Sequence, residues 1–190
     1  NTRQDCLFGL ARYILSTHDY HAIINYFSSH SKYNLMEIRA FAERILFGNT
    51  LQDKLAPLDH YQDSQPGQPL KTPDQPGRPA ALALDNWLQR QRVRFSEVRN
   101  FHSEKERGLV LHFFANHELL ALELMALALL KFPQAPPKFR RGLVQTLRDE
   151  QLHVQLYQER MHRIGLELGT IPVSDFFWRL LSDMKSPMDF

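Results

Sequence analysis

The sequence has very little cysteine and almost no net charge, and each shortage excludes a class of protein. Cys6 is the only cysteine among 190 residues, which excludes a disulfide scaffold and any zinc or iron–sulfur site built from several cysteines. The 23 lysines and arginines nearly balance the 21 aspartates and glutamates, which excludes a histone-like polycation and an acidic tail. We find no glycine-rich phosphate loop, no strand-like alternation and no internal repeat.

The sequence also lacks a long apolar run that is free of charge. Its longest apolar stretch, residues 109–130, contains Glu118 and Glu123. An ionised carboxylate near the middle of a membrane span costs roughly 2.5–3.5 kcal/mol. We therefore interpret this stretch as a helix buried inside a protein, with no membrane partner. The first residues show no charged start, apolar segment and cleavage site, so we expect a cytoplasmic protein.

Hydrophobic patterning divides the chain into three parts. Residues 1–56 form a helical N-terminal region, in which the spacing of apolar residues predicts one helix over 7–15 and another from Leu35 to Leu46, capped by Asn34 and stopped by Gly48. Residues 57–81 hold six of the eleven prolines, a density that predicts an extended connector or an arm wrapped over the surface. Residues 82–190 are helical again, and the predicted fold class is therefore all-α.

The third part contains a predicted helical hairpin over residues 109–165. One helix runs from Leu109 to Phe132, residues 133–137 (Pro-Gln-Ala-Pro-Pro) break it, and the next runs from Lys138 to about Gly165. A break this short makes the two helices antiparallel neighbours.

Two residues of the second helix are candidate metal ligands. Glu150 and His153 lie in the middle of its apolar face, an unusual place for a carboxylate, because burying an ionised Glu is costly unless it is paired or bound to a metal. Their i, i+3 spacing lets both side chains reach one cation. A carboxylate with an imidazole suits iron, manganese or zinc.

The first helix offers Glu118 as a third ligand. Glu118 lies 14 residues before Phe132 and Glu150 lies 13 after Pro137, so an antiparallel hairpin places the two carboxylates level. Glu123 is the competing ligand, but it shares another stripe of the helix with His112 and Asn116, which favours a polar network behind the site.

Each of these assignments has a plainer alternative. Glu150 and His153 could form a buried salt bridge, with Glu118 bonded to an arginine or a tyrosine. Tyr157 could donate a hydrogen bond, act as a redox-active neighbour or simply fill the core. Glu159 and His162 repeat the same spacing on the solvated side of the helix, and His117 fits a helix surface better than a ligand.

A run of basic residues gives an alternative function. The basic residues between Arg90 and Arg107 fit a solvated helix face, or in a minority reading a contact to RNA or phosphate. On that reading the chain is a non-catalytic helical module that binds RNA or a protein. Separately, residues 176–178 (Phe-Phe-Trp) are expected to be a core anchor after the turn at Pro172.

Several motifs, taken together, resemble a known family. They are the run 111–130 with Glu118, followed by Phe132-Pro-Gln-Ala-Pro136, Asp149-Glu-Gln-Leu-His153 and Asp175-Phe-Phe-Trp178, and preceded by Ala42-Glu-Arg-Ile-Leu-Phe47, Asp53-Lys-Leu55 and Pro76-Gly-Arg-Pro-Ala80. In this order they resemble the ferritin-like family labelled domain of unknown function 455, over about residues 35–190. The resemblance implies a ferritin-like helical bundle with a di-iron or di-manganese centre.

Such a centre needs another Glu and another Glu-x-x-His from two more helices, and we find no such set after His153. We therefore expect half a site, to be completed by a homo-oligomer or by a C-terminal remainder; Glu37 and Glu43 are weaker possibilities. The predicted function is a non-haem iron or manganese oxidase or hydroxylase, acting on a small molecule or RNA of unknown identity.

Overall fold

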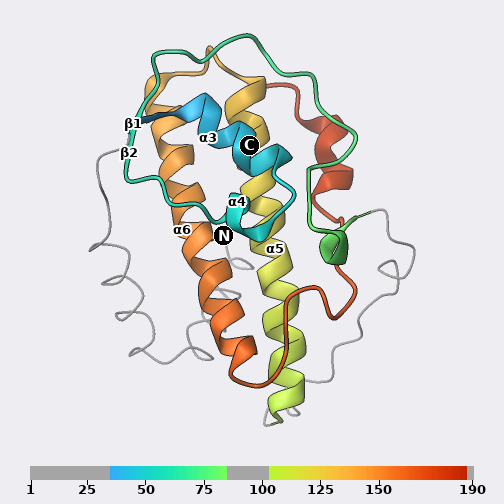
Figure 1. The fold of residues 1–190 in the computed structure, drawn as a ribbon. Coiled ribbons are helices and arrows are strands. Elements are labelled where there is room, and N and C mark those ends of the chain that lie inside the picture. Colours follow the sequence, from blue (N-terminus) through green and yellow to red (C-terminus); the bar gives the residue numbers. More distant parts are fainter. Residues whose placement is uncertain (1–34, 85–102, 188–190) are drawn as a thin grey trace.

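A helical hairpin dominates the computed structural model, which describes residues 35–84 and 103–187 (Figure 1). Helix α5 (Glu104–Lys131) and helix α6 (Pro137–His162) run side by side. Helix α3 (Ile38–Phe47) packs against α5. The chain is therefore mostly α-helical, as predicted, and the predicted antiparallel pair of helices is present.

Local chemistry sets the ends of α5. The Ser103 side chain accepts a hydrogen bond from the Glu106 N–H, which caps the helix at its first turn. Glu104 and Glu106 place negative charge at that end and Lys131 places positive charge at the other, both favourable to the helix dipole. The helix thus begins five residues earlier than the predicted Leu109, because the polar capping sequence carries no apolar periodicity.

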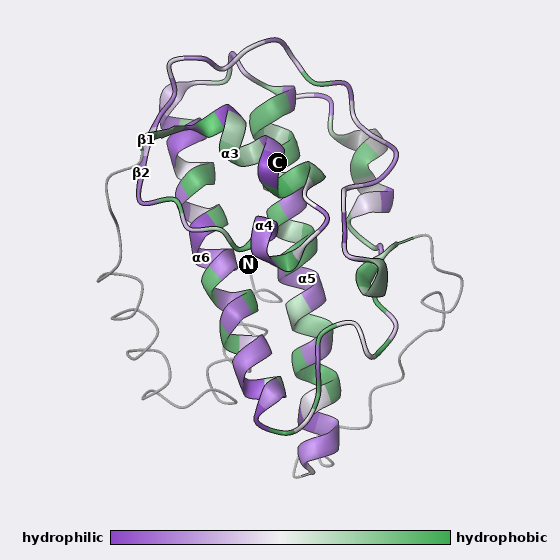
Figure 2. Ribbon diagram, in the orientation of Figure 1, coloured by the Kyte–Doolittle hydropathy of each residue, from purple (hydrophilic) through white to green (hydrophobic). Residues whose placement is uncertain are grey.

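Helix α6 starts with a proline and is amphipathic. Pro137 occupies the first helical position, where its missing N–H costs nothing. Hydrophobic and hydrophilic stretches alternate along the helix (Figure 2). It ends at His162 rather than near the predicted Gly165, because residues 163–165 form a turn in which Gly165 takes a positive φ of 72°.

A small parallel sheet departs from the predicted all-α fold. Strand β1 (Leu35–Glu37) pairs with β2 (His60–Gln62), with Leu35 opposite His60. Leu35 was predicted to lie on the apolar face of a helix, but it belongs to β1 and is 59% exposed. Three-residue strands are too short to show alternation, so the sequence could not reveal them. Gly48 ends α3, as predicted.

The connector lies over the hairpin as an ordered arm. After the short helix α4 (Leu51–Lys54) and strand β2, it passes over the end where α5 and α6 are joined (Figure 1). There the Leu70 N–H donates to the Leu130 carbonyl, and Arg140 binds Asp63 at 2.6 Å. A 3-10 turn, η1 (Ala80–Leu82), closes the arm.

One hydrophobic core joins all three parts of the chain. It includes Ile38, Leu58 and Leu82 together with the inner faces of α5 and α6. Among the described residues, α5 is the one helix long and apolar enough to cross a membrane by length and composition, and most of it is buried in this core. That burial agrees with the interpretation of the stretch as an interior helix.

The C-terminal segment returns to the core through a tryptophan. Trp178 begins the 3-10 helix η4 (Trp178–Asp183), is buried, and donates from its Nε1 to the Asp74 carbonyl at 2.8 Å. The anchor predicted at residues 176–178 is therefore Trp178. Phe176, in contrast, is 51% exposed.

Candidate metal centre

Three side chains of the hairpin converge on one point. Glu118 projects from α5, and Glu150 and His153 project from adjacent turns of α6. One possible ligand atom from each lies within 4.8 Å of the other two. The structure therefore brings together the three ligands that were predicted from the sequence.

The packing of the hairpin explains this convergence. Glu118 and Glu150 are both buried, at 7% and 8% exposure. The His153 Nδ1 lies 2.7 Å from a Glu150 carboxylate oxygen across one helical turn, as the i, i+3 spacing allows. His153 is the more open member of the group, with 26% of its side chain exposed.

Two negative charges on neighbouring, buried carboxyl groups are energetically unfavourable. Burial raises the pKa of Glu118, and the charge of the neighbouring Glu150 raises it further. Burial is also the main cause that raises the pKa of Tyr157, and the charges of Glu118 and Glu150 add to it. Among the described residues, no lysine or arginine forms an ion pair with Glu118 or Glu150.

This donor set fits a divalent cation. Two oxygen ligands and one imidazole nitrogen, gathered in a largely buried place, suit iron, manganese or zinc. A bound cation would remove the cost of burying both carboxylates. Tyr157 is 2% exposed, and its ring packs against Phe114 at a centroid distance of 6.2 Å, so this part of the hairpin is apolar.

His117 stands apart from the three converging residues. It was predicted to be a surface residue, but it is partly buried in an aromatic cluster. Its ring lies 6.0 Å from that of Phe113 and 4.3 Å from that of Phe177, between centroids. Burial lowers the pKa of His117, and the charge of Glu150 opposes that change.

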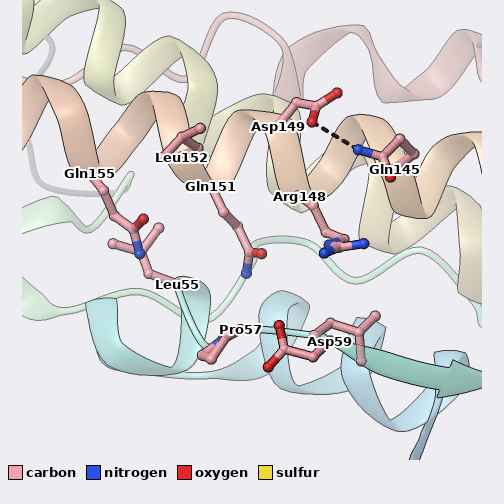
Figure 3. Close-up of a pocket in the computed structure, with 10 residues that line it drawn as sticks. Leu55, Pro57, Asp59, Gln145, Arg148, Asp149, Gln151, Leu152 and Gln155 are labelled. Carbon is pink, nitrogen blue, oxygen red and sulfur yellow. Dashed lines mark hydrogen bonds between the residues drawn. The ribbon is translucent and has the colours of Figure 1, made fainter. Parts of the chain in front are cut away.

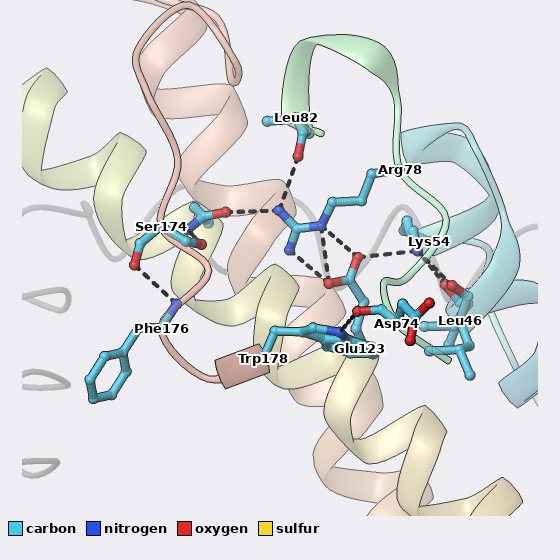
Figure 4. A network of polar contacts seen from close by, with 11 residues as sticks. Leu46, Lys54, Asp74, Arg78, Leu82, Glu123, Ser174, Phe176 and Trp178 are labelled. Carbon is cyan, nitrogen blue, oxygen red and sulfur yellow. Dashed lines mark hydrogen bonds and ion pairs between the residues drawn. The ribbon is translucent and has the colours of Figure 1, made fainter. Parts of the chain in front are cut away.

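Glu123 belongs to a separate buried network, as the sequence favoured (Figure 4). Arg78 donates to both of its carboxylate oxygens, the shortest contact being 2.7 Å, and Lys54 pairs with it at 3.1 Å. Asn116 accepts from Arg78 and donates to the Ser174 carbonyl. Sequence reasoning missed the pairing of Arg78 and Lys54 with Glu123, because the motifs that contain these two residues specify no partner on α5.

His112 is not part of the Glu123 contacts. Its Nε2 accepts a hydrogen bond from the Gly169 N–H at 2.9 Å, and burial lowers its pKa to about 4. Gly169 has a φ of 100°, a conformation that suits glycine. His112 therefore holds the segment that follows α6 against α5.

The weaker candidates are all engaged elsewhere. Glu159 pairs with Arg163 and His162 with Glu167, on the exposed side of α6. Glu37 accepts hydrogen bonds from Gln62, Ser64 and Gln65, and Glu43 pairs with Arg39.

Most of the basic run predicted as a solvated face or RNA contact lies outside the described residues. Of its members, Lys105 is exposed and Arg107 pairs with Glu104. The predicted helix over 7–15, Asn34 and Cys6 also lie outside the described residues.

A surface pocket lies on another face of α6. It has a volume of about 260 Å³ and is formed between α6 and residues 55–59 (Figure 3). Arg148 and Asp149 contribute to its walls, whereas Glu118, Glu150 and His153 do not. The pocket and the converging ligands are thus separate features.

Comparison with known families identifies the chain. A family model described as "Protein of unknown function (DUF455)" matches residues 31–190, and the chain belongs to this family. No curated protein and no solved structure matches it. The family description names no activity.

Proposed function

We propose that this chain supplies part of a ferritin-like di-metal carboxylate centre, which binds iron or manganese and serves an oxidase or hydroxylase. The supporting observation is the convergence of Glu118, Glu150 and His153 from two neighbouring helices. Ferritin-like centres take a Glu from one helix and a Glu-x-x-His from another, twice over. The hairpin matches one such half, and the other donors would come from outside the described residues.

Each residue has a defined role in this proposal. Glu118 and Glu150 would hold the metal through oxygen and reduce its charge, and His153 would hold it through a neutral imidazole. The buried surroundings, including Tyr157, would limit access of water and so strengthen electrostatic interactions at the site. When bound, iron or manganese would supply the redox chemistry needed to use dioxygen.

The test is metal content, with a control that the chain itself offers. The protein is loaded anaerobically with Fe(II) or Mn(II), desalted and analysed for bound metal. The double variant Glu150→Gln/His153→Ala should lose the metal. The variant Glu159→Gln/His162→Ala changes the same two residue types at the same spacing on the exposed side, and should keep it.

Two results would contradict the proposal. One is a wild-type protein that retains no metal after loading. The other is equal retention by both double variants, with the fold of each verified by circular dichroism. Dioxygen consumption by the iron-loaded protein then separates an oxidase or hydroxylase from a metal site without redox chemistry.

A further inference from the structure

We propose that Lys54 is a positioning residue for the metal centre: it contacts both ligand-bearing helices at once and fixes the offset between them that the site requires. The inference rests on the proposed function and deepens it. Lys54 lies in α4, outside the hairpin, and no ligand motif includes it. Its role follows from where its side chain and its backbone carbonyl are bound.

The side chain of Lys54 reaches α5. It is fully buried, and its Nζ pairs with a Glu123 carboxylate oxygen at 3.1 Å (Figure 4). The same Nζ donates to the carbonyl of Ile45 at 2.5 Å, in the last turn of α3. Glu123 also binds Arg78, so one carboxylate faces two cations. The negative end of the α3 dipole helps to balance the charge of Lys54.

The backbone of Lys54 is bonded to α6. Its carbonyl accepts a hydrogen bond from the Gln151 Nε2 at 2.8 Å, and the Ala56 carbonyl accepts another from the same atom at 3.0 Å. Gln151 is 5% exposed and directly follows Glu150 in the sequence. The segment 54–56 therefore fixes α6 next to one of the candidate metal ligands.

These two attachments lie near the candidate ligands, one on each helix of the hairpin. Glu123 follows Glu118 by five residues, about 7.5 Å along α5 at 1.5 Å per residue. Slipping one helix against the other by a single residue shifts its side chains by about 1.5 Å along the axis and turns them by about 100°. The three candidate ligand atoms lie within 4.8 Å of one another, so such a slip would separate Glu150 from Glu118.

The first test removes the charged side-chain contact. Lys54→Met keeps the length and apolar stem of the side chain, and leaves Glu123 paired with Arg78. Lys131→Met is the matched control, because Lys131 also ties α5 to the connector, through Thr72 at 2.9 Å, but lies at the far end of the helix. Mn(II) affinity is measured by calorimetry, and site geometry by the visible spectrum of the Co(II)-loaded protein.

We expect Lys54→Met to bind Mn(II) at least about tenfold more weakly and to change the Co(II) spectrum, while Lys131→Met matches the wild type in both. A Lys54→Met protein that is folded and binds Mn(II) with wild-type affinity and an unchanged Co(II) spectrum would overturn the inference. The spectrum matters because a loss of overall stability alone would not change the coordination of bound Co(II).

A second variant keeps the inference testable if Lys54→Met does not fold. Gln151→Met removes both bonds to segment 54–56 and keeps the side-chain volume, and Gln145→Met, at an exposed position of α6, is its control. Weaker Mn(II) binding by Gln151→Met alone would support the inference, and equal binding by both would refute it. A wild-type protein that binds neither metal would instead refute the proposed function, and the inference with it.

Discussion

The carboxyl group of Glu118 on α5 faces the carboxyl group of Glu150 on α6, with a possible ligand atom of each within 4.8 Å of the other. Burial, together with the charge of Glu150, raises the pKa of Glu118 to about 9. In the metal-free protein at neutral pH Glu118 therefore carries a proton. A divalent cation would take its place, so metal binding should release protons.

Metal should therefore stabilise the folded protein. Because the three ligands converge only when the hairpin is folded, a metal at about 100 times its dissociation constant should add about 2.7 kcal/mol to the free energy of unfolding. Thermal unfolding of the loaded protein, with and without a chelator, measures this effect. An unchanged melting temperature after chelation of protein shown to be loaded would count against a metal at this site.

Glu118→Gln should have opposite effects in the two states. In the metal-free protein at neutral pH it should raise the free energy of unfolding by about 1 kcal/mol, or roughly 2–4 °C in melting temperature, because folding then no longer requires residue 118 to take up a proton that the unfolded chain lacks at this pH. The same change should abolish stabilisation by metal. Scanning calorimetry on both states checks this, and a substitution that destabilises the metal-free protein would contradict it.

Glu123→Gln should be strongly destabilising. It leaves the buried side chains of Lys54 and Arg78 without a counter-charge, and breaking a buried ion pair in this way costs about 3–5 kcal/mol. Asp175→Asn is the control, because Asp175 forms a largely exposed pair with Arg179, worth about 0–1 kcal/mol. Urea unfolding gives both values, and similar costs would show that the buried cluster is unimportant.

His112 should make stability depend on pH. Burial depresses its pKa from 6.5 to about 4, so its contribution is complete above pH 6.5 and falls as the pH drops toward 4. The loss attributable to this residue is about 3 kcal/mol. His112→Gln should flatten the dependence, whereas His162→Gln, at a side chain 77% exposed, should not. Urea unfolding from pH 7 to pH 4 distinguishes the two variants.

Arg140→Met should release the connector without unfolding the hairpin. Arg140 is 2% exposed and donates to Asp63 and to the carbonyls of Leu129 and Phe132. Its loss removes the Arg140 donor from the Leu129 carbonyl, leaves the Phe132 carbonyl with the Ala135 N–H, and detaches the arm, at a cost of about 2–3 kcal/mol. Hydrogen exchange should rise over residues 57–72. Arg141→Met, at the exposed neighbouring position, should leave exchange unchanged.

The sequence was most informative about the hairpin. Glu150 and His153 could be selected because a carboxylate on an apolar face is expensive, and Glu118 because the short Pro-rich break fixes which residues of two antiparallel helices are level. These arguments use only helical geometry and the cost of burial. The structure places the three ligand atoms together, whereas their binding of a metal stays a prediction.

Long-range polar contacts were beyond the reach of the same reasoning. The pairing of Arg78 with Glu123 joins the connector to the middle of α5, and nothing in either local sequence specifies the other. The parallel sheet was missed for a related reason: three-residue strands carry no period, and Leu35 fitted a helical pattern that the chain follows only from Ile38 onward. Local periodicity describes elements, while these contacts depend on how the elements meet.

All three candidate ligands lie on one uninterrupted stretch of chain, two helices and the turn between them. Such a stretch can be copied or transplanted as a single genetic segment without separating its donor atoms. Grafted into an unrelated helical scaffold with its own inward-facing carboxylates, it would offer a ready-made fragment for engineering artificial metalloproteins.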